Sequence, residues 1–198
     1  SVLQGKRSNY EGDPFTAILR ATAERAGTRY GQDPAADVAM RVIADHARAT
    51  AFLIADGVTP EKTGRSYVLR RIMRRAIRHG TLVGLDEPFF HHVCDEVVDR
   101  FGDAYPELRD ARAAISESVQ FEEQSFRRTL ARGLKMVEAT LAELPEGAES
   151  FLIEPAAKLY DTYGFPIDLT RVIAEEHDLA LDEDAVADHV RELQGNAE

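Results

Sequence analysis

Apolar residues recur along this 198-residue chain every three or four positions, and no stretch shows the apolar–polar alternation that marks a strand. The glycines, prolines and acids between the apolar runs are typical of helix ends. Helices are therefore expected over residues 13–26, 38–55, 65–79, 89–101, 106–144, 156–163, 168–177 and 182–193. The pattern predicts an all-α fold, in which helical bundle subdomains are joined by a long amphipathic helix.

The longest predicted helix, 106–144, carries a near-heptad apolar stripe and has no strong stop signal. Glu123 and Arg127 are expected to pair across one turn of its polar face. Gly133 is its weak point, about 1 kcal/mol less favourable than Ala. Unbroken, the helix would be about 58 Å long. The predicted division is a helical subdomain over 1–103, the connecting helix over 104–146 and a C-terminal helical subdomain over 147–198.

The second helix is apolar nearly all round and is expected to be buried, with Asp37 as its N-cap. Its polar residues have two interpretations. Arg41, Asp45 and Arg48 have the spacing of an internal salt-bridge ladder. Alternatively, Asp45 and His46 face a site that the next helix serves.

That next helix, residues 65–79, carries six arginines, and no acid occurs between Glu61 and Asp86. Gly80 is expected to end the helix. At 100° per residue the segment has an apolar face and a basic face, with Arg65 at the helix start. The apolar face holds Val68, Leu69, Ile72, Met73, Ala76 and Ile77, and the basic face holds Tyr67, Arg70, Arg71, Arg74, Arg75 and Arg78.

Like charges one turn apart repel on a helix, and Arg70–Arg74, Arg71–Arg75 and Arg74–Arg78 are such pairs. Guanidinium groups bind phosphate in a bidentate way, so the basic face suits a nucleic-acid backbone, with Tyr67 available for stacking. The competing interpretation is that these arginines pair with acids from elsewhere in the fold. Since the chain has 35 acidic residues, both interpretations remain open.

The formal net charge of -11 argues against a protein that coats nucleic acid indiscriminately, but it permits binding through one patch. The single cysteine, Cys94, excludes an internal disulfide and a cysteine zinc cluster. No apolar run reaches the roughly 18 residues of a membrane span. The chain also lacks an initiator Met and a leader pattern, so we expect a cytoplasmic protein and a piece of something longer.

The segment Asp86-Glu87-Pro88 is expected to open the fourth helix by the same capping logic. His91, His92 and Cys94 follow it, but adjacent histidines point about 100° apart on a helix and no second ligand pair has zinc-like spacing. We therefore expect no metal site and no catalytic site, because a phosphate-cradling glycine loop and a nucleophile with a paired base are also absent from the sequence.

Near the C-terminus, Gly164 and Pro166 force a break between two short helices. Asp161 lies just before this break, between two tyrosines. One interpretation is a loop that recognises a partner through the Asp161 carboxylate as a hydrogen-bond acceptor. The alternative is a helix-turn-helix corner in which the tyrosines serve packing.

Four runs in this order and spacing resemble alanyl-tRNA synthetase, a class II aminoacyl-tRNA synthetase. They are Arg41-Val42-Ile43-Ala44-Asp45-His46, Phe52-Leu53-Ile54-Ala55-Asp56-Gly57, Gly64-Arg65-Ser66-Tyr67-Val68-Leu69-Arg70-Arg71-Ile72-Met73-Arg74-Arg75-Ala76 and Leu159-Tyr160-Asp161-Thr162-Tyr163-Gly164-Phe165-Pro166. The resemblance extends from Asn9 to about Leu193 and covers the helical, tRNA-recognition middle of that family.

The resemblance implies a ligase that joins alanine to its tRNA through an alanyl-adenylate made with ATP and magnesium. The catalytic motifs of the family come before this region, and its editing domain, with a zinc site, comes after it. The resemblance thus implies a segment that binds the tRNA acceptor stem, holds no cofactor itself and has the catalytic and editing domains of its parent chain as partners.

The resemblance also implies that an arginine matching Arg74 or Arg75, together with Asp161, recognises a G·U wobble pair in the acceptor stem. The tRNA-binding residues expected here are Arg65, Tyr67, Arg70, Arg71, Arg74, Arg75, Arg78 and Asp161. The family's loop asparagine before the basic helix has no counterpart, so either Lys62 or the Gly64 backbone replaces it, or the base contact is weaker. A helical scaffold that docks an acidic protein surface or a neighbouring domain is the competing function.

Overall fold

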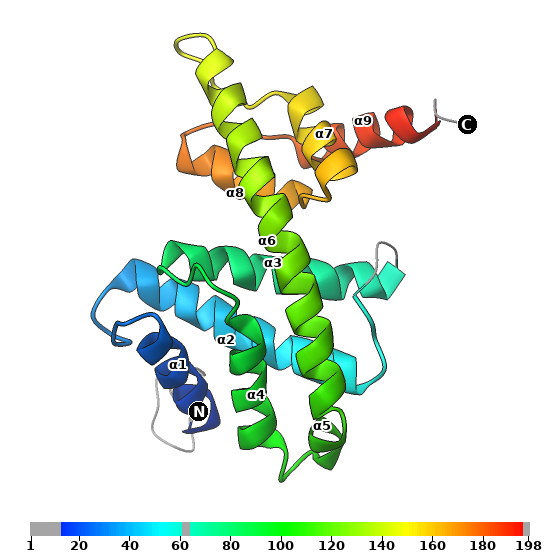
Figure 1. Cartoon of the computed structure of the whole chain (residues 1–198). Coiled ribbons are helices and arrows are strands. Elements are labelled where there is room, and N and C mark those ends of the chain that lie inside the picture. Colours follow the sequence, from blue (N-terminus) through cyan, green and yellow to red (C-terminus); the bar gives the residue numbers. More distant parts are fainter. Residues whose placement is uncertain (1–12, 61–63, 196–198) are drawn as a thin grey trace. The chain divides into compact units, whose positions relative to one another are not determined.

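The computed structural model describes residues 13–60 and 64–195, and Figure 1 shows that these residues are helical almost throughout. The helices are α1 (Asp13–Arg25), α2 (Pro34–Ala55), α3 (Gly64–Leu82), α4 (Phe90–Phe101), α5 (Pro106–Asp110), α6 (Arg112–Glu143), α7 (Ile153–Tyr163), α8 (Ile167–Glu176) and α9 (Glu183–Gly195). In the described part of the chain, β-pairing is limited to one isolated parallel bridge, between Ser150 and Ala180. The predicted all-α fold is confirmed.

The chain divides into two compact units, and the boundary falls inside α6, between Gln124 and Ser125. The sequence had predicted a separate connecting part, 104–146, around this position. In the structure α6 belongs to both units, because its N-terminal half contributes to the core of unit 1 and its C-terminal half to the core of unit 2.

In unit 1, α2 packs against α1, α3 and α4. Its side chains Ile43, Ala44 and Ala47 are fully buried, which confirms that the second helix lies inside. The predicted cap, however, is wrong. Asp33 caps α2 by accepting a hydrogen bond at Oδ1 from the Ala35 backbone N–H, 3.0 Å away, and Pro34 occupies the first helical turn.

Further helix boundaries differ from those predicted, as at the start of α6 and the end of α3. The helix expected over 106–144 is broken, because α5 ends in a C-cap at Ala111 before α6 begins. Helix α3 does not end at Gly80 but continues to Leu82. Gly80 instead makes room for the Phe89 ring, since a Cβ on this glycine would lie 2.3 Å from two ring carbons.

The start of α4 is stabilised from outside its own segment. The predicted cap at Asp86-Glu87-Pro88 is wrong, because α4 begins at Phe90 and its N-cap residue makes no side-chain cap. The carboxylate of Glu123 on α6 replaces it, accepting hydrogen bonds from the backbone N–H groups of Phe89 (3.1 Å) and Phe90 (2.9 Å). Glu123 is fully buried, so it does not lie on an exposed polar face.

In unit 2, α7, α8 and α9 pack on one another. Gly164 ends α7 with φ of +63°, a left-handed conformation that favours glycine, and its N–H donates to the Tyr160 carbonyl. The next residue, Phe165, is fully buried against Gly133 of α6, where a Cβ would lie 2.7 Å from the ring. Gly133 therefore has a packing role that its helix propensity does not reveal.

Candidate nucleic-acid interface

Helix α3 carries the basic face that the sequence predicted. Leu69, Met73 and Ile77 are fully buried, and α2 covers this side of the helix. At 100° per residue, the arginines lie on the side of the helix that faces away from these apolar side chains. Val68, by contrast, is 53% exposed and does not belong to the packed face, where the sequence pattern had placed it.

The basic face is partly neutralised within unit 1. Arg70 Nε and Arg74 Nε both donate to Oε1 of Glu122 on α6, over 3.0 and 2.7 Å respectively. The interpretation that arginines of this helix pair with acids from elsewhere in the fold is therefore confirmed for Arg70 and Arg74. The physical reason is proximity, because α6 brings a buried carboxylate to a helix that lies about fifty residues earlier in the chain.

Arg74 lies deeper than the other arginines, with 3% of its surface exposed. Burial lowers the pKa of its guanidinium from the ordinary value, and Glu122 raises it in opposition. A buried cation of this kind needs its partner, because desolvation disfavours the charged form. Arg74 thus fixes α3 to α6 and does not present its charge to solvent.

The remaining arginines of α3 lie along the other edge of the basic face. Arg71 is exposed, and its guanidinium carbon lies 5.9 Å from the ring centroid of Tyr67, within cation–π range. Arg75 and Arg78 are half-buried, and Arg78 Nη1 donates to the Thr81 hydroxyl over 3.2 Å. These three arginines and Tyr67 form the outer row, the part of the basic face that reaches the surface.

Two histidines lie near the outer row. Burial, together with the charges of the nearby His46, Arg75 and Arg78, lowers the pKa of His79 to about 4. The pKa of His46 is also lowered, mainly by burial, with Asp45 acting in the opposite direction and Arg75 in the same direction. Arg75 acts on both imidazoles, so both histidines lie close to its charge. The interpretation that Asp45 and His46 face a site served by the basic helix stays a prediction.

The salt-bridge interpretation of α2 is confirmed for the pair of Asp45 and Arg48. Arg48 Nη2 lies 2.9 Å from Asp45 Oδ1 on an exposed surface, as its spacing predicted. Asp45 Oδ2 lies 3.8 Å from His46 Nδ1. Asp45 therefore contacts both Arg48 and His46.

Asp161 lies on unit 2, in the last turn of α7 and not in a loop. It is exposed, and its Oδ1 accepts a hydrogen bond from Gln194 Nε2 of α9 over 3.0 Å. Its Oδ2 has no hydrogen-bond partner among the described residues. Sequence reasoning missed Gln194, because no local signal links two residues that are 33 positions apart.

Two predicted contributors lie outside the described residues: Lys62, and the side chain of Arg65, whose backbone belongs to the first turn of α3. The rest of the predicted interface is divided between the two units. Unit 1 carries the arginines and Tyr67, and unit 2 carries Asp161.

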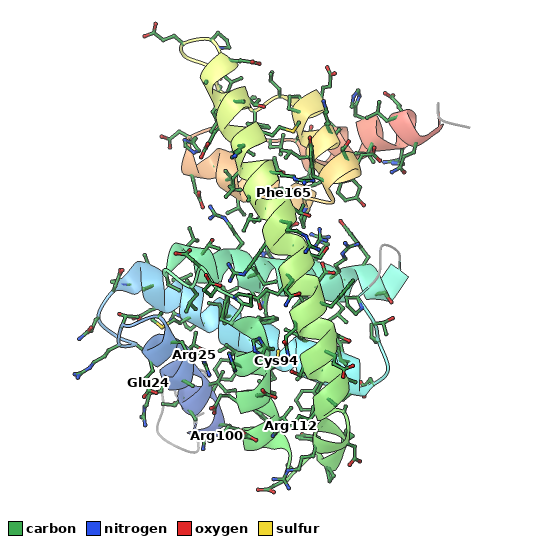
Figure 2. All side chains as sticks on the ribbon, in the orientation of Figure 1. Glu24, Arg25, Cys94, Arg100, Arg112 and Phe165 are labelled. Carbon is green, nitrogen blue, oxygen red and sulfur yellow. The ribbon has the colours of Figure 1, made fainter. Side chains whose placement is uncertain are left out.

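The histidines of α4 are not arranged as ligands. The rings of His91 and His92 lie with centroids 3.9 Å apart, and burial is the main cause that lowers the pKa of each. Cys94, labelled in Figure 2, is fully buried in unit 1. Burial raises the pKa of its thiol. Among the described residues, no group of three or more His, Cys, Asp or Glu side chains could hold a metal ion.

No described helix is both long and apolar enough to cross a membrane.

The whole chain, residues 1–198, matches the model of a family described as tRNA synthetases class II (A). The chain belongs to this family. It is 49% identical to the alanine–tRNA ligase of Anaeromyxobacter sp. (strain Fw109-5) over 214 residues, which cover 100% of the chain and 24% of that protein.

Two further relatives agree with this assignment. The chain is 53% identical to the alanine–tRNA ligase of Myxococcus xanthus over 184 residues, covering 92% of the chain and 20% of that protein. It is 44% identical to that of Carboxydothermus hydrogenoformans over 198 residues, covering 100% of the chain and 23% of that protein. The chain thus spans less than a quarter of the length of these relatives, and the family resemblance predicted from the sequence is confirmed.

Proposed function

We propose that this chain is the part of an alanine–tRNA ligase that binds the tRNA acceptor stem, while the chemistry that joins alanine to tRNA with ATP belongs to other parts of such a ligase. The observation that carries the proposal is the outer row of α3. An acidic chain presents Arg71, Arg75 and Arg78 together with Tyr67 on one helix edge. Arginines in a row suit the phosphates of an RNA backbone, which fix orientation without reading sequence.

Arg70 and Arg74 have a different role in this proposal. Both donate to Glu122 of α6, and this shared carboxylate holds their edge of α3 in place. The outer row therefore rests on a helix that cannot rotate without breaking a buried ionic contact. Arg65, whose side chain lies outside the described residues, stays a predicted phosphate contact.

Asp161 is the proposed reader of the G·U pair. A wobble pair leaves the exocyclic amino group of guanine unpaired in the wide, shallow minor groove of an A-form stem, and a carboxylate is a suitable acceptor for it. An acid in the last turn of a helix is also unfavourable, by about 0.3–1 kcal/mol, because the helix dipole is negative there. Asp161 thus occupies a position that does not favour the stability of α7.

Gln194 supports this role by orienting the carboxylate. Since Oδ1 of Asp161 accepts from Gln194, Oδ2 is the oxygen that this proposal assigns to the guanine amino group. A fixed carboxylate loses less side-chain entropy on binding than a rotating one.

The experiment is a filter-binding titration of a hairpin RNA that carries the alanine acceptor stem, at several salt concentrations. Arg71→Gln and Arg75→Gln should each reduce the slope of log affinity against log salt by about 0.7–0.9, the amount of one phosphate contact. Arg20→Gln removes one exposed arginine from α1 and should leave the slope unchanged. Wild-type slopes in both α3 variants would contradict the proposal.

The alternative is a scaffold whose arginine face docks an acidic protein surface. The contact of Arg70 and Arg74 with Glu122 favours it, because it shows that α3 accepts a carboxylate partner. Titration with polyglutamate separates the two functions. Binding to polyglutamate but not to the hairpin RNA would establish the scaffold.

A further inference from the structure

A second basic surface lies on α6 within unit 2. Arg128, Arg132 and Lys135 follow one another at steps of four and three residues, which places them on one face of the helix. All three side chains are exposed. The stripe extends over about 10 Å of the helix axis. We call these three residues the α6 stripe.

The α6 stripe points away from the core of unit 2. On the opposite face of the same helix, Phe126, Leu130 and Val137 are buried, and Gly133 receives the Phe165 ring. The side chains of the stripe therefore do not contribute to packing. Substituting them changes the surface of unit 2 and leaves its interior intact.

None of the three makes a hydrogen bond or an ion pair with any residue in the described part of the chain, in contrast to Arg70 and Arg74. Unit 2 could supply partners, because residues 125–198 contain sixteen acidic and seven basic residues. Glu138, exposed on the same helix three positions after Lys135, is not paired with it. The fold has thus left this row of cations to solvent within an acidic unit.

The arrangement has a cost on its own helix. Arg128 and Arg132 repel each other across one turn, as do Arg132 and Lys135, by a few tenths of a kcal/mol per pair. An anionic ligand that bridges the side chains removes this repulsion. A linear row of cations fits a linear row of anions, which is the form of a nucleic-acid backbone.

We propose that the α6 stripe binds the phosphate backbone of RNA and forms a second contact surface, on the unit that carries Asp161. The identity of the RNA rests on the proposed function of the chain. An acidic protein is the less suitable partner, because protein interfaces are enriched in aromatic residues at their centre. The residue between the two arginines on this face is the exposed Ala131, and phosphate contacts need no apolar centre.

The test is a filter-binding titration of the full chain with the acceptor-stem hairpin, comparing the triple variant Arg128→Gln, Arg132→Gln, Lys135→Gln with the wild type. Gln is a good helix former, so α6 is retained, and circular dichroism verifies it. The matched control is Arg20→Gln, Arg100→Gln, Lys158→Gln. It removes the same charge from exposed positions on α1, α4 and α7.

The stripe variant should lower the slope of log affinity against log salt by about 2–3, the amount of three phosphate contacts. It should keep the wild-type preference for a G·U over a G·C hairpin, because phosphate contacts carry no sequence information. The control should keep the wild-type slope. A wild-type slope in the stripe variant, or an equal loss in the control, would overturn the inference.

This result is separable from the proposed function. If the stripe variant keeps the wild-type slope while Arg71→Gln and Arg75→Gln reduce it, the inference fails and the proposed function stands. If the stripe variant reduces the slope while the α3 and Asp161 variants bind as the wild type does, the proposed residues fail and the α6 stripe stands. A wild-type chain that binds polyglutamate but no hairpin would overturn both.

Discussion

Oε1 of Glu122 lies 2.7 Å from Nε of Arg74, and both side chains are buried. The same oxygen accepts from Arg70 Nε. One carboxylate of α6 therefore holds two cations of α3, and the basic helix is divided into an anchored edge and an outer row. The division follows from burial, because a charged group removed from water requires a partner.

Glu122→Ala is expected to destabilise the chain by about 3–5 kcal/mol, because it leaves the buried guanidinium of Arg74 and the half-buried one of Arg70 without their carboxylate. Urea unfolding measures the effect. Glu117→Ala, an exposed acid on the same helix, should change stability by about 0.5 kcal/mol or less. Equal effects of the two substitutions would show that the buried contact contributes nothing.

Glu123→Ala is expected to loosen the start of α4, because two buried backbone N–H groups lose their acceptor at a cost of about 1–3 kcal/mol. Hydrogen exchange should show faster exchange of the Phe89 and Phe90 amides than in the wild type, while the amides in the middle of α2 stay protected. Unchanged exchange at both amides would contradict the capping role.

Gly133→Ala is expected to destabilise unit 2, although Ala favours a helix by about 1 kcal/mol over Gly. The reason is that the added Cβ would lie 2.7 Å from the Phe165 ring. Gly195→Ala on α9 is the control, since no heavy atom lies within 4 Å of its added Cβ. The melting temperatures of both variants measure the effect. A gain in stability for Gly133→Ala would contradict the predicted clash with Phe165.

These contacts show which features of the structure local sequence patterns do not predict. Local patterns predicted the all-α fold, the two faces of α3 and the turn at Gly164, because each depends on residues a few positions apart. Glu122 meets Arg70 across 52 positions, and no periodicity indicates such a partner. Gly133 was predicted to be a weak point of the helix for the same reason. Its contact with the Phe165 ring joins residues that are far apart in the sequence.

The misplaced boundaries have a local cause. Asp33 and Asp37 both precede apolar residues, but only Asp33 is followed by proline, and it is the cap in the structure. Asp37 accepts instead from the N–H of Gly31, over 2.8 Å. The Asp33–Pro34 signal was present in the sequence and outweighs the acid nearest to the apolar run. The break at Ala111 had no such signal.

Acidification is expected to destabilise unit 1. The pKa of His79 is about 4 in the folded chain against 6.5 ordinarily, so between these values the unfolded chain binds a proton that the folded chain does not. Stability contributed by neutral His79 is complete above pH 6.5 and is lost as the pH falls toward 4. His46 has a lowered pKa and acts in the same direction.

Urea unfolding at pH 7 and pH 5 tests this. His79→Asn should lose less stability between the two pH values than the wild type, because it has no group to protonate. His189→Asn provides the comparison at a histidine on α9 in unit 2. The explanation is wrong if His79→Asn and the wild type lose the same amount.

The most direct test of the central claim, that this chain binds the tRNA acceptor stem and reads its G·U pair, is the ratio of affinities for two hairpins that differ only in G·U against G·C. The wild type should prefer the G·U hairpin, and Asp161→Ala should bind both equally while keeping the wild-type salt slope, because the carboxylate contacts a base and no phosphate. A wild-type chain without this preference, or an Asp161→Ala variant that retains it in full, would contradict the account.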